Sequence, residues 1–121
     1  MDISISAVAS SVKKLSKVAG PMNVIVDFCL IPMGDGISVA RHVAECQRIL
    51  QAAGLSHQLH AYGTNIEGDW ETVMSAIKKC HETVHGMGAP RINTTLKIGT
   101  RNDRDQSMQE KIDRVETLLG A

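Results

Sequence analysis

Apolar and polar positions after residue 20 follow each other in a pattern that predicts a succession of strands and helices. Residues 22–31 are largely apolar on both faces of a predicted strand, which is typical of a central strand that is covered on both sides. A turn is expected at 32–36. Short strands are predicted at 56–62 and 64–67, and residues 91–98 alternate cleanly between apolar and polar side chains.

Helical spacing of apolar residues predicts a helix between the first two strands, another after the third strand, and one at the C-terminus. Ser38 is the expected cap of the first helix and Gly54 its end, and Asp69 is the expected cap of the second. The expected buried stripes are Val39, Val43, Cys46, Leu50 and Ala53 in the first helix, Trp70, Val73, Met74, Ile77, His81 and Val84 in the second, and Met108, Ile112, Val115 and Leu119 in the last.

The resulting order βαββαβ, followed by a helix, predicts an α/β (α+β) domain with the ferredoxin-like arrangement. Two helices then cover one face of a four-stranded antiparallel sheet and leave the other face open. The open face would carry Ile25, Cys29 and Ile31 beside Asp27. Because exposing so much apolar surface to water is unfavourable, we expect a second copy of the chain to bury this face or an edge strand.

Residues 1–20 differ from the rest of the chain, and Gly20-Pro21 is the natural boundary of a domain at 21–121. Lysines at 13, 14 and 17 and apolar residues at helical spacing predict an amphipathic helix. Two interpretations stay open for this extension: an organelle-targeting segment, or an accessory helix packed on the domain or on a neighbouring subunit.

Composition narrows the classes of function. A chain of 121 residues fits one domain, and its formal net charge of zero argues against nucleic acid or an anionic membrane as partner. The aromatic residues are one Phe, one Tyr and one Trp, too few for a platform that stacks nucleic-acid bases. The three cysteines are widely spaced, which indicates free thiols, a reducing compartment such as the cytoplasm, and no cysteine zinc site.

Residues 81–85 match the HExxH pattern of zinc hydrolases, in which two histidines one helical turn apart hold the metal and the glutamate activates water. His81 shares the stripe of Ile77 and Val84, however, and no downstream signature supplies a third ligand. A structural or interfacial pair of histidines, His81 and His85, is the favoured interpretation. A metal-dependent hydrolase that uses them with Glu82 is the alternative.

Two polar segments are candidates for ligand chemistry. Arg101 and Arg104 lie in a loop with two acids, which fits either an anion site or an Arg–Asp network that fixes the last helix or an interface. Residues 62–70 place a hydroxyl, a carboxylate and an indole at a hairpin and helix entrance. Such groups suit a flat polar heterocycle, and they equally suit a structural corner with Trp70 in the core.

Several segments in order, 27–34, 63–68, 80–82, 88–92 and 97–101, resemble the YkoF-like thiamine-binding protein family over about residues 23–119. The GT-x-IEG stretch of this pattern is present as Gly63, Thr64, Ile66, Glu67 and Gly68. The resemblance implies a ferredoxin-like fold and assembly into homodimers or homotetramers through sheet contacts. It also implies binding of thiamine or its hydroxymethylpyrimidine part, without a cofactor and without known catalysis.

The favoured hypothesis is therefore a non-catalytic protein that binds a thiamine-like small molecule near the open sheet face or a subunit junction. Thr64 and Glu67 are the first candidate contacts, and Asp27, Asn93 and Thr95 are further candidates on the open face. The alternatives are a structural or regulatory homo-oligomer without a ligand, and the metal-dependent hydrolase.

Overall fold

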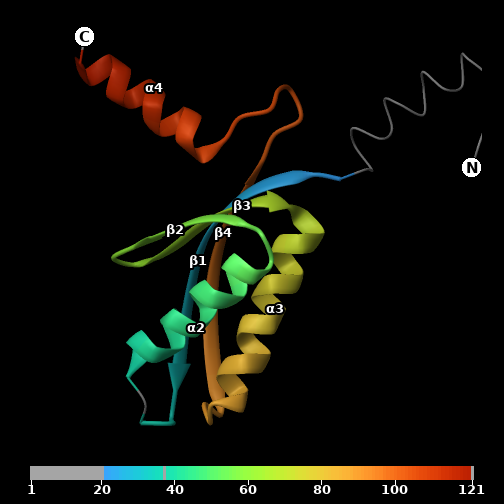
Figure 1. Cartoon of the computed structure of the whole chain (residues 1–121), viewed down its shortest axis with the longest axis vertical. Coiled ribbons are helices and arrows are strands. Elements are labelled where there is room, and N and C mark those ends of the chain that lie inside the picture. The colour runs from blue at the N-terminus through green and yellow to red at the C-terminus, as the bar shows by residue number, and fades with distance from the viewer. Residues whose placement is uncertain (1–20, 37, 121) are drawn as a thin grey trace, which may run out of the picture.

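The computed structural model describes residues 21–36 and 38–120, so the predicted N-terminal helix lies outside the described residues. The elements follow the predicted order (Figure 1). They are β1 (Asn23–Met33), α2 (Val39–Ala52), β2 (Ser56–His60), β3 (Gly63–Asp69), α3 (Trp70–Gly86), β4 (Arg91–Thr100) and α4 (Met108–Gly120).

The four strands form one sheet in the order β2-β3-β1-β4, and every neighbouring pair is antiparallel. The strand predicted to be central is central: Val26 of β1 lies between Ile66 of β3 and Ile98 of β4. Helices α2 and α3 lie side by side on one face of the sheet (Figure 1). The ferredoxin-like βαββαβ prediction is confirmed.

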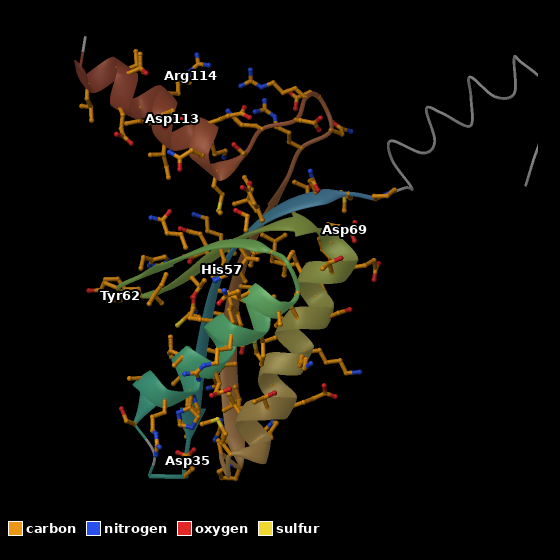
Figure 2. All side chains as sticks on the ribbon, viewed as in Figure 1. Asp35, His57, Tyr62, Asp69, Asp113 and Arg114 are labelled. Carbon is orange, nitrogen blue, oxygen red and sulfur yellow. The ribbon has the colours of Figure 1, made fainter. Side chains whose placement is uncertain are left out.

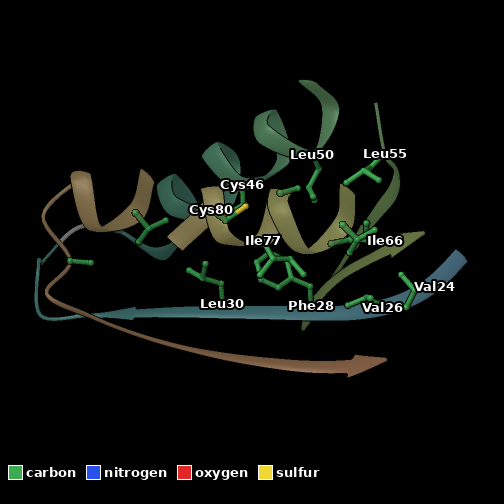
Figure 3. Packing of buried hydrophobic residues seen from close by; sticks show 14 residues of the cluster. Val24, Val26, Phe28, Leu30, Cys46, Leu50, Leu55, Ile66, Ile77 and Cys80 are labelled. Carbon is green, nitrogen blue, oxygen red and sulfur yellow. The ribbon is translucent and has the colours of Figure 1, made fainter. Parts of the chain in front are cut away.

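The core lies between the sheet and these two helices (Figure 3). Every second residue of β1 points into it, because side chains alternate between the two faces of a strand. The apolar residues that are buried there are Val24, Val26, Phe28, Leu30, Cys46, Leu50, Leu55, Ile66, Val73, Ala76, Ile77, Cys80, Val84 and Ala89. The other residues of β1 face the side of the sheet that α2 and α3 do not cover.

Strand β1 continues through Pro32 and Met33, where the sequence predicts a turn. Its pairing with β3 reaches only to Phe28, whereas its pairing with β4 continues to Met33. Beyond Phe28 the strand therefore has a neighbour on one side only. Proline, which has no N–H to donate, is tolerated in such an edge position. The turn begins two residues later than predicted, at Gly34, with a φ of 92°.

The hairpin between β2 and β3 is shifted relative to the prediction. Strand β2 ends at His60, and Gly63, predicted as the turn, is the first residue of β3. The turn is formed by Ala61 and Tyr62 instead. Gly63 is paired with His60 in the register of the two strands, and its lack of a side chain becomes important for the site described below.

Helix α2 buries part of the predicted stripe, Cys46 and Leu50. Val39 of that stripe is half-exposed, and His42, which was not predicted, is fully buried. The side chain of Ser38 makes no capping hydrogen bond. The predicted end at Gly54 is confirmed: its N–H donates to Gln51 O at 3.0 Å while its φ is 71°, as in a Schellman cap.

Helix α3 begins as predicted, because the carboxylate of Asp69 accepts a hydrogen bond from the backbone N–H of Thr72 at 3.3 Å. Its buried stripe includes Cys80, while His81 is only half-buried. The prediction placed His81 on that stripe. The difference is one residue along the helix, which rotates a side chain by about 100°.

Helix α4 has the predicted apolar spacing, yet none of its residues is buried. It lies beyond the end of the sheet, apart from α2 and α3 (Figure 1). Val115 is 57% exposed and Leu119 is 81% exposed. Among the described residues, no helix combines the length and the apolar character needed to cross a membrane.

Candidate functional site

The open face of the sheet carries a row of polar side chains across all four strands. Asp27 on β1 is paired with Asn65 on β3 and with Lys97 on β4, and Asn65 is paired with Gln58 on β2. Directly paired residues point to the same face. The row therefore sets an acid, two amides and an amine side by side on the surface that the helices leave uncovered.

A half-open cavity of about 720 Å³ lies over this row, between the sheet and the segment that leads into α4. This volume is in the range of small-molecule sites. The sheet contributes Asp27, Asn65, Glu67 and Lys97, and the α4 side contributes residues from Arg101 to Lys111. The charged lining residues are Asp27, Glu67, Asp105 and Glu110 against Lys97, Arg101, Arg104 and Lys111. The cavity thus combines charges of both signs with apolar groups such as Ile25 and Ile98.

The carboxylate of Asp27 is held in place by His60. The Nε2–H of His60 donates to Asp27 Oδ1 at 2.7 Å, and the backbone N–H of Tyr62 donates to His60 Nδ1 at 3.2 Å. The second contact requires an unprotonated Nδ1, which assigns the proton of a neutral ring to Nε2. Gly63 lies under this bridge, where an added Cβ would approach Phe28 O to 2.6 Å and Asp27 Oδ1 to 3.4 Å.

Glu67 joins the cavity to α4. Its Oε2 accepts a hydrogen bond from the backbone N–H of Met108 at 2.9 Å, at the first residue of the helix. A carboxylate is favourable there, because the N-terminus of a helix carries free N–H groups and a partial positive charge. One oxygen of Glu67 therefore anchors the helix at the rim of the cavity.

The loop before α4 contains an Arg–Asp network, which is one of the two arrangements that the sequence allowed for Arg101. Arg101 donates from Nε and Nη2 to both oxygens of Asp103, at 2.6 and 2.8 Å, and from Nη1 to Gln106 at 2.7 Å. The hydrogen bond from Arg101 lowers the pKa of the Asp103 carboxyl to about 2 and raises the pKa of Arg101. Arg104 lines the cavity near this network.

The structure brings together only some of the predicted contacts. Asp27 and Glu67 line the cavity, whereas Asn93 and Thr95 lie on the open face outside its lining. Thr64 points to the opposite face, where it is 3% exposed and its Oγ1 accepts a hydrogen bond from Gln47 at 2.9 Å. Thr64 and Glu67 are three residues apart on one strand, an odd separation that places them on opposite faces.

Asn65, Lys97 and His60 belong to this region and were not among the predicted contacts. Asn65 lies two residues before Glu67, so alternation alone would have placed it on the same face. Lys97 follows from alternation in β4 in the same way. His60 could not be found from local pattern, since its contact with Asp27 depends on the order of the strands.

The histidines of the HExxH segment are engaged with protein groups. His81 Nε2 lies 2.6 Å from Thr94 Oγ1, and His85 Nδ1 lies 2.7 Å from Ala89 O. Burial, together with the nearby His85, lowers the pKa of His81. Within the described part of the chain, no three His, Cys, Asp or Glu side chains are close enough to share a metal ion.

Figure 2 shows that polar side chains gather between the sheet and α4. Trp70, the indole predicted for either a site or a core, packs half-buried against the core. Tyr62 is 87% exposed at the hairpin turn. Among the described residues no aromatic side chain lines the cavity, and its apolar part comes from aliphatic residues such as Ile25 and Ile98.

Comparison with known proteins gives a consistent answer. A model of the family described as thiamine-binding protein matches residues 26–116. A UPF0045 protein of Synechocystis is 59% identical over 98 residues, which cover 81% of each chain. A UPF0045 protein of Eremothecium gossypii is 38% identical over 99 residues, which cover 81% of this chain and 94% of the relative.

Solved structures show the same fold. A protein of Methanocaldococcus jannaschii superimposes with a TM-score of 0.72 at 28% identity, over 78% of this chain and 97% of that one. A protein of Thermotoga maritima, assigned provisionally to thiamine biosynthesis or salvage, superimposes with a TM-score of 0.67 at 17% identity, over 77% and 98%. At that identity the second likeness supports the fold alone.

Proposed function

This chain belongs to the thiamine-binding protein family, and from that premise we propose that it binds thiamine or its hydroxymethylpyrimidine part in the cavity on the open sheet face, without catalysing a reaction. The observation that carries the proposal is the position of Asp27 and Asn65 side by side in a cavity of suitable volume, within the matched segment. Thiamine joins an aminopyrimidine to a cationic ring, so it offers both donors and positive charge to this surface.

Each polar group has a defined role in the proposal. The carboxylate of Asp27 accepts a hydrogen bond from the amino group of the pyrimidine, and the amide of Asn65 donates to a ring nitrogen. His60 fixes the orientation of Asp27, which lowers the ordering cost of binding. No residue is assigned a catalytic role.

Calorimetric titration of the full chain with thiamine, and separately with hydroxymethylpyrimidine, tests the proposal. We expect saturable binding that Asn65→Ala weakens roughly tenfold, the loss of about one hydrogen bond. Asn93→Ala is the matched control, because this second asparagine also lies on the open face but outside the cavity. Absence of binding at millimolar ligand contradicts the proposed function, and a larger effect of Asn93→Ala moves the site toward the other end of the sheet.

We also propose that the chain assembles with itself through the open sheet face, as a homodimer or homotetramer. The support is apolar surface beyond the cavity: Ile31 is 49% exposed, and the half-buried Cys29 shares its face. Because its cysteines are free thiols, which suit a reducing compartment, we expect the chain in the cytoplasm. Light scattering after size exclusion measures the assembly, and a monomer at micromolar concentration contradicts it.

A further inference from the structure

Helix α4 and the open sheet face are two uncovered surfaces of one chain. The helix exposes an apolar stripe of Ile112 (41% exposed), Val115 (57%) and Leu119 (81%). On the open face of the sheet, β1 exposes Ile31 (49%) beside the half-buried Cys29. A helix of this length is marginal in water unless it buries its apolar side. Something must therefore cover α4.

The uncovered part of the open face lies beyond the cavity. Ile25 and Asp27 line the cavity together with Glu110 and Lys111 of α4, whereas Cys29 and Ile31 lie outside its lining. A second copy can therefore cover the half of β1 that carries Cys29 and Ile31 without entering the cavity.

The chain directs α4 away from its own sheet. The bond from Met108 N–H to Glu67 fixes the first residue of the helix at the end of the sheet where β4 finishes. The bonds of Arg101 to Asp103 and Gln106 tie the connecting loop into a fixed turn. From this anchor the helix extends beyond the sheet, as Figure 1 shows. Ile31, toward the opposite end of β1, is 49% exposed.

We propose that α4 of one copy packs its apolar stripe on the open sheet face of a second copy, and that the exchange is reciprocal. A two-fold arrangement forms the helix–sheet contact twice, which is how a short helix reaches the buried area of about 1,200 Å² that a stable dimer needs. Because Glu110 and Lys111 of α4 line the cavity, the exchange holds that wall of the cavity in place. This inference rests on the proposed self-association and names the element that carries it.

Substitutions on two sides of α4 separate this inference from self-association in general. In the full chain, Val115→Gln together with Leu119→Gln removes the apolar stripe, and Thr117→Gln is the control on the opposite side of the same helix. We expect the double variant to raise the dissociation constant of the assembly at least roughly tenfold, by loss of buried apolar area. The control should leave the constant unchanged. If the wild type assembles and the double variant assembles equally well, self-association stands and the role of α4 is wrong.

A cross-link identifies the surface on which α4 lies. Its result does not depend on whether a substitution in the apolar stripe weakens folding. Cys29 supplies a native thiol on the open face. Ile112→Cys, Val115→Cys and Leu119→Cys each add a thiol to the stripe, and Thr117→Cys is the control. Diamide takes two hydrogens from the thiol pair, forms the disulfide and becomes the hydrazine.

We expect at least one stripe variant to give a covalent dimer whose peptide map joins Cys29 to the new cysteine, and the control to give none. A disulfide between these two positions within one chain shows that α4 covers its own sheet. A dimer joined only through the two new cysteines shows contact between two α4 helices. Either result, or no disulfide to Cys29 from any stripe position, overturns the inference.

Discussion

The Nε2 of His60 lies 2.7 Å from Oδ1 of Asp27, although their strands β2 and β1 are not neighbours in the sheet. The bridge passes over Gly63 of the intervening strand, which has no side chain to obstruct it. One glycine thus permits both close contact of the strands and the orientation of a carboxylate in the candidate site.

Gly63→Ala should therefore destabilise the domain by roughly 1–3 kcal/mol, the usual cost of overpacking. The added Cβ would lie 2.6 Å from the backbone oxygen of Phe28, which cannot move as a side chain can. Gly99→Ala is the control, since its Cβ would stay 3.9 Å from Ile25 O. Urea unfolding gives both free energies, and equal losses would show that the close approach is relieved at little cost.

Glu67→Ala should loosen α4 while leaving the core intact. The carboxylate bonded to Met108 N–H replaces an N-cap, whose loss costs about 1 kcal/mol. Hydrogen exchange of residues 108–120 should accelerate roughly fivefold, and exchange of β1 should not change. Glu116→Ala, within α4 itself, is the comparison variant. Unchanged exchange in α4 after Glu67→Ala would mean that other contacts hold the helix.

The pKa of His81 should be found below 6.5, because burial disfavours the charged ring and His85 adds repulsion. Its contribution to stability is present above the unfolded pKa and is lost as the pH falls toward the folded pKa, since the unfolded chain takes up the proton first. An NMR titration measures the value directly. His85→Gln should raise the pKa of His81 without restoring it fully, because the larger cause, burial, remains.

The three thiols should differ in reactivity according to exposure. A hydrogen bond between Cys46 and Cys80 lowers the pKa of Cys46 and raises that of Cys80, but both side chains are buried in the core. Burial, and not the pKa, should decide the reactivity of these two thiols, because a reagent must reach the sulfur to react. At concentrations low enough to separate the copies, native protein should release one equivalent of chromophore from a thiol reagent, through Cys29, and denatured protein should release three. The Cys29→Ser variant should not react with the reagent until it unfolds. Rapid reaction of the folded variant would show that Cys46 or Cys80 is accessible.

Alternation and helical periodicity were sufficient to predict the fold because each is a local property of the chain. The alternate residues of β1 point to the core, Asp69 caps α3, and Gly54 ends α2 through a positive φ that suits glycine. Pro32 was misread because a turn residue is also acceptable where a strand has lost one neighbour.

The candidate site was predicted less well, because its contacts depend on tertiary register. Thr64 and Glu67 are neighbours in a motif, yet alternation sends them to opposite faces, which the strand assignment alone would have revealed. The contact of Glu67 with Met108 crosses 41 positions, and nothing local indicates it. The buried His42 was missed because an imidazole in a helical stripe has no apolar signal.

Two His–Asp pairs among the described residues should contribute differently to stability, although their distances are nearly equal. His42 Nε2 lies 2.6 Å from Asp35, with side chains 0% and 6% exposed, and His60 Nε2 lies 2.7 Å from Asp27, with side chains 35% and 46% exposed. Breaking a buried pair costs about 3 kcal/mol, because a desolvated carboxylate loses this partner, whereas water replaces the partner of an exposed one for under ~1 kcal/mol.

His42→Leu should therefore destabilise the domain by about 3 kcal/mol, and His60→Leu by less than ~1 kcal/mol. His42 also loses the contact of its Nδ1 with Ser38 O at 3.1 Å, which adds to the difference in the same direction. Urea unfolding at neutral pH measures both variants. Equal destabilisation by the two variants would mean that water reaches the carboxylate of Asp35 once His42 is removed. The start of α2 would then be accessible to solvent in the variant.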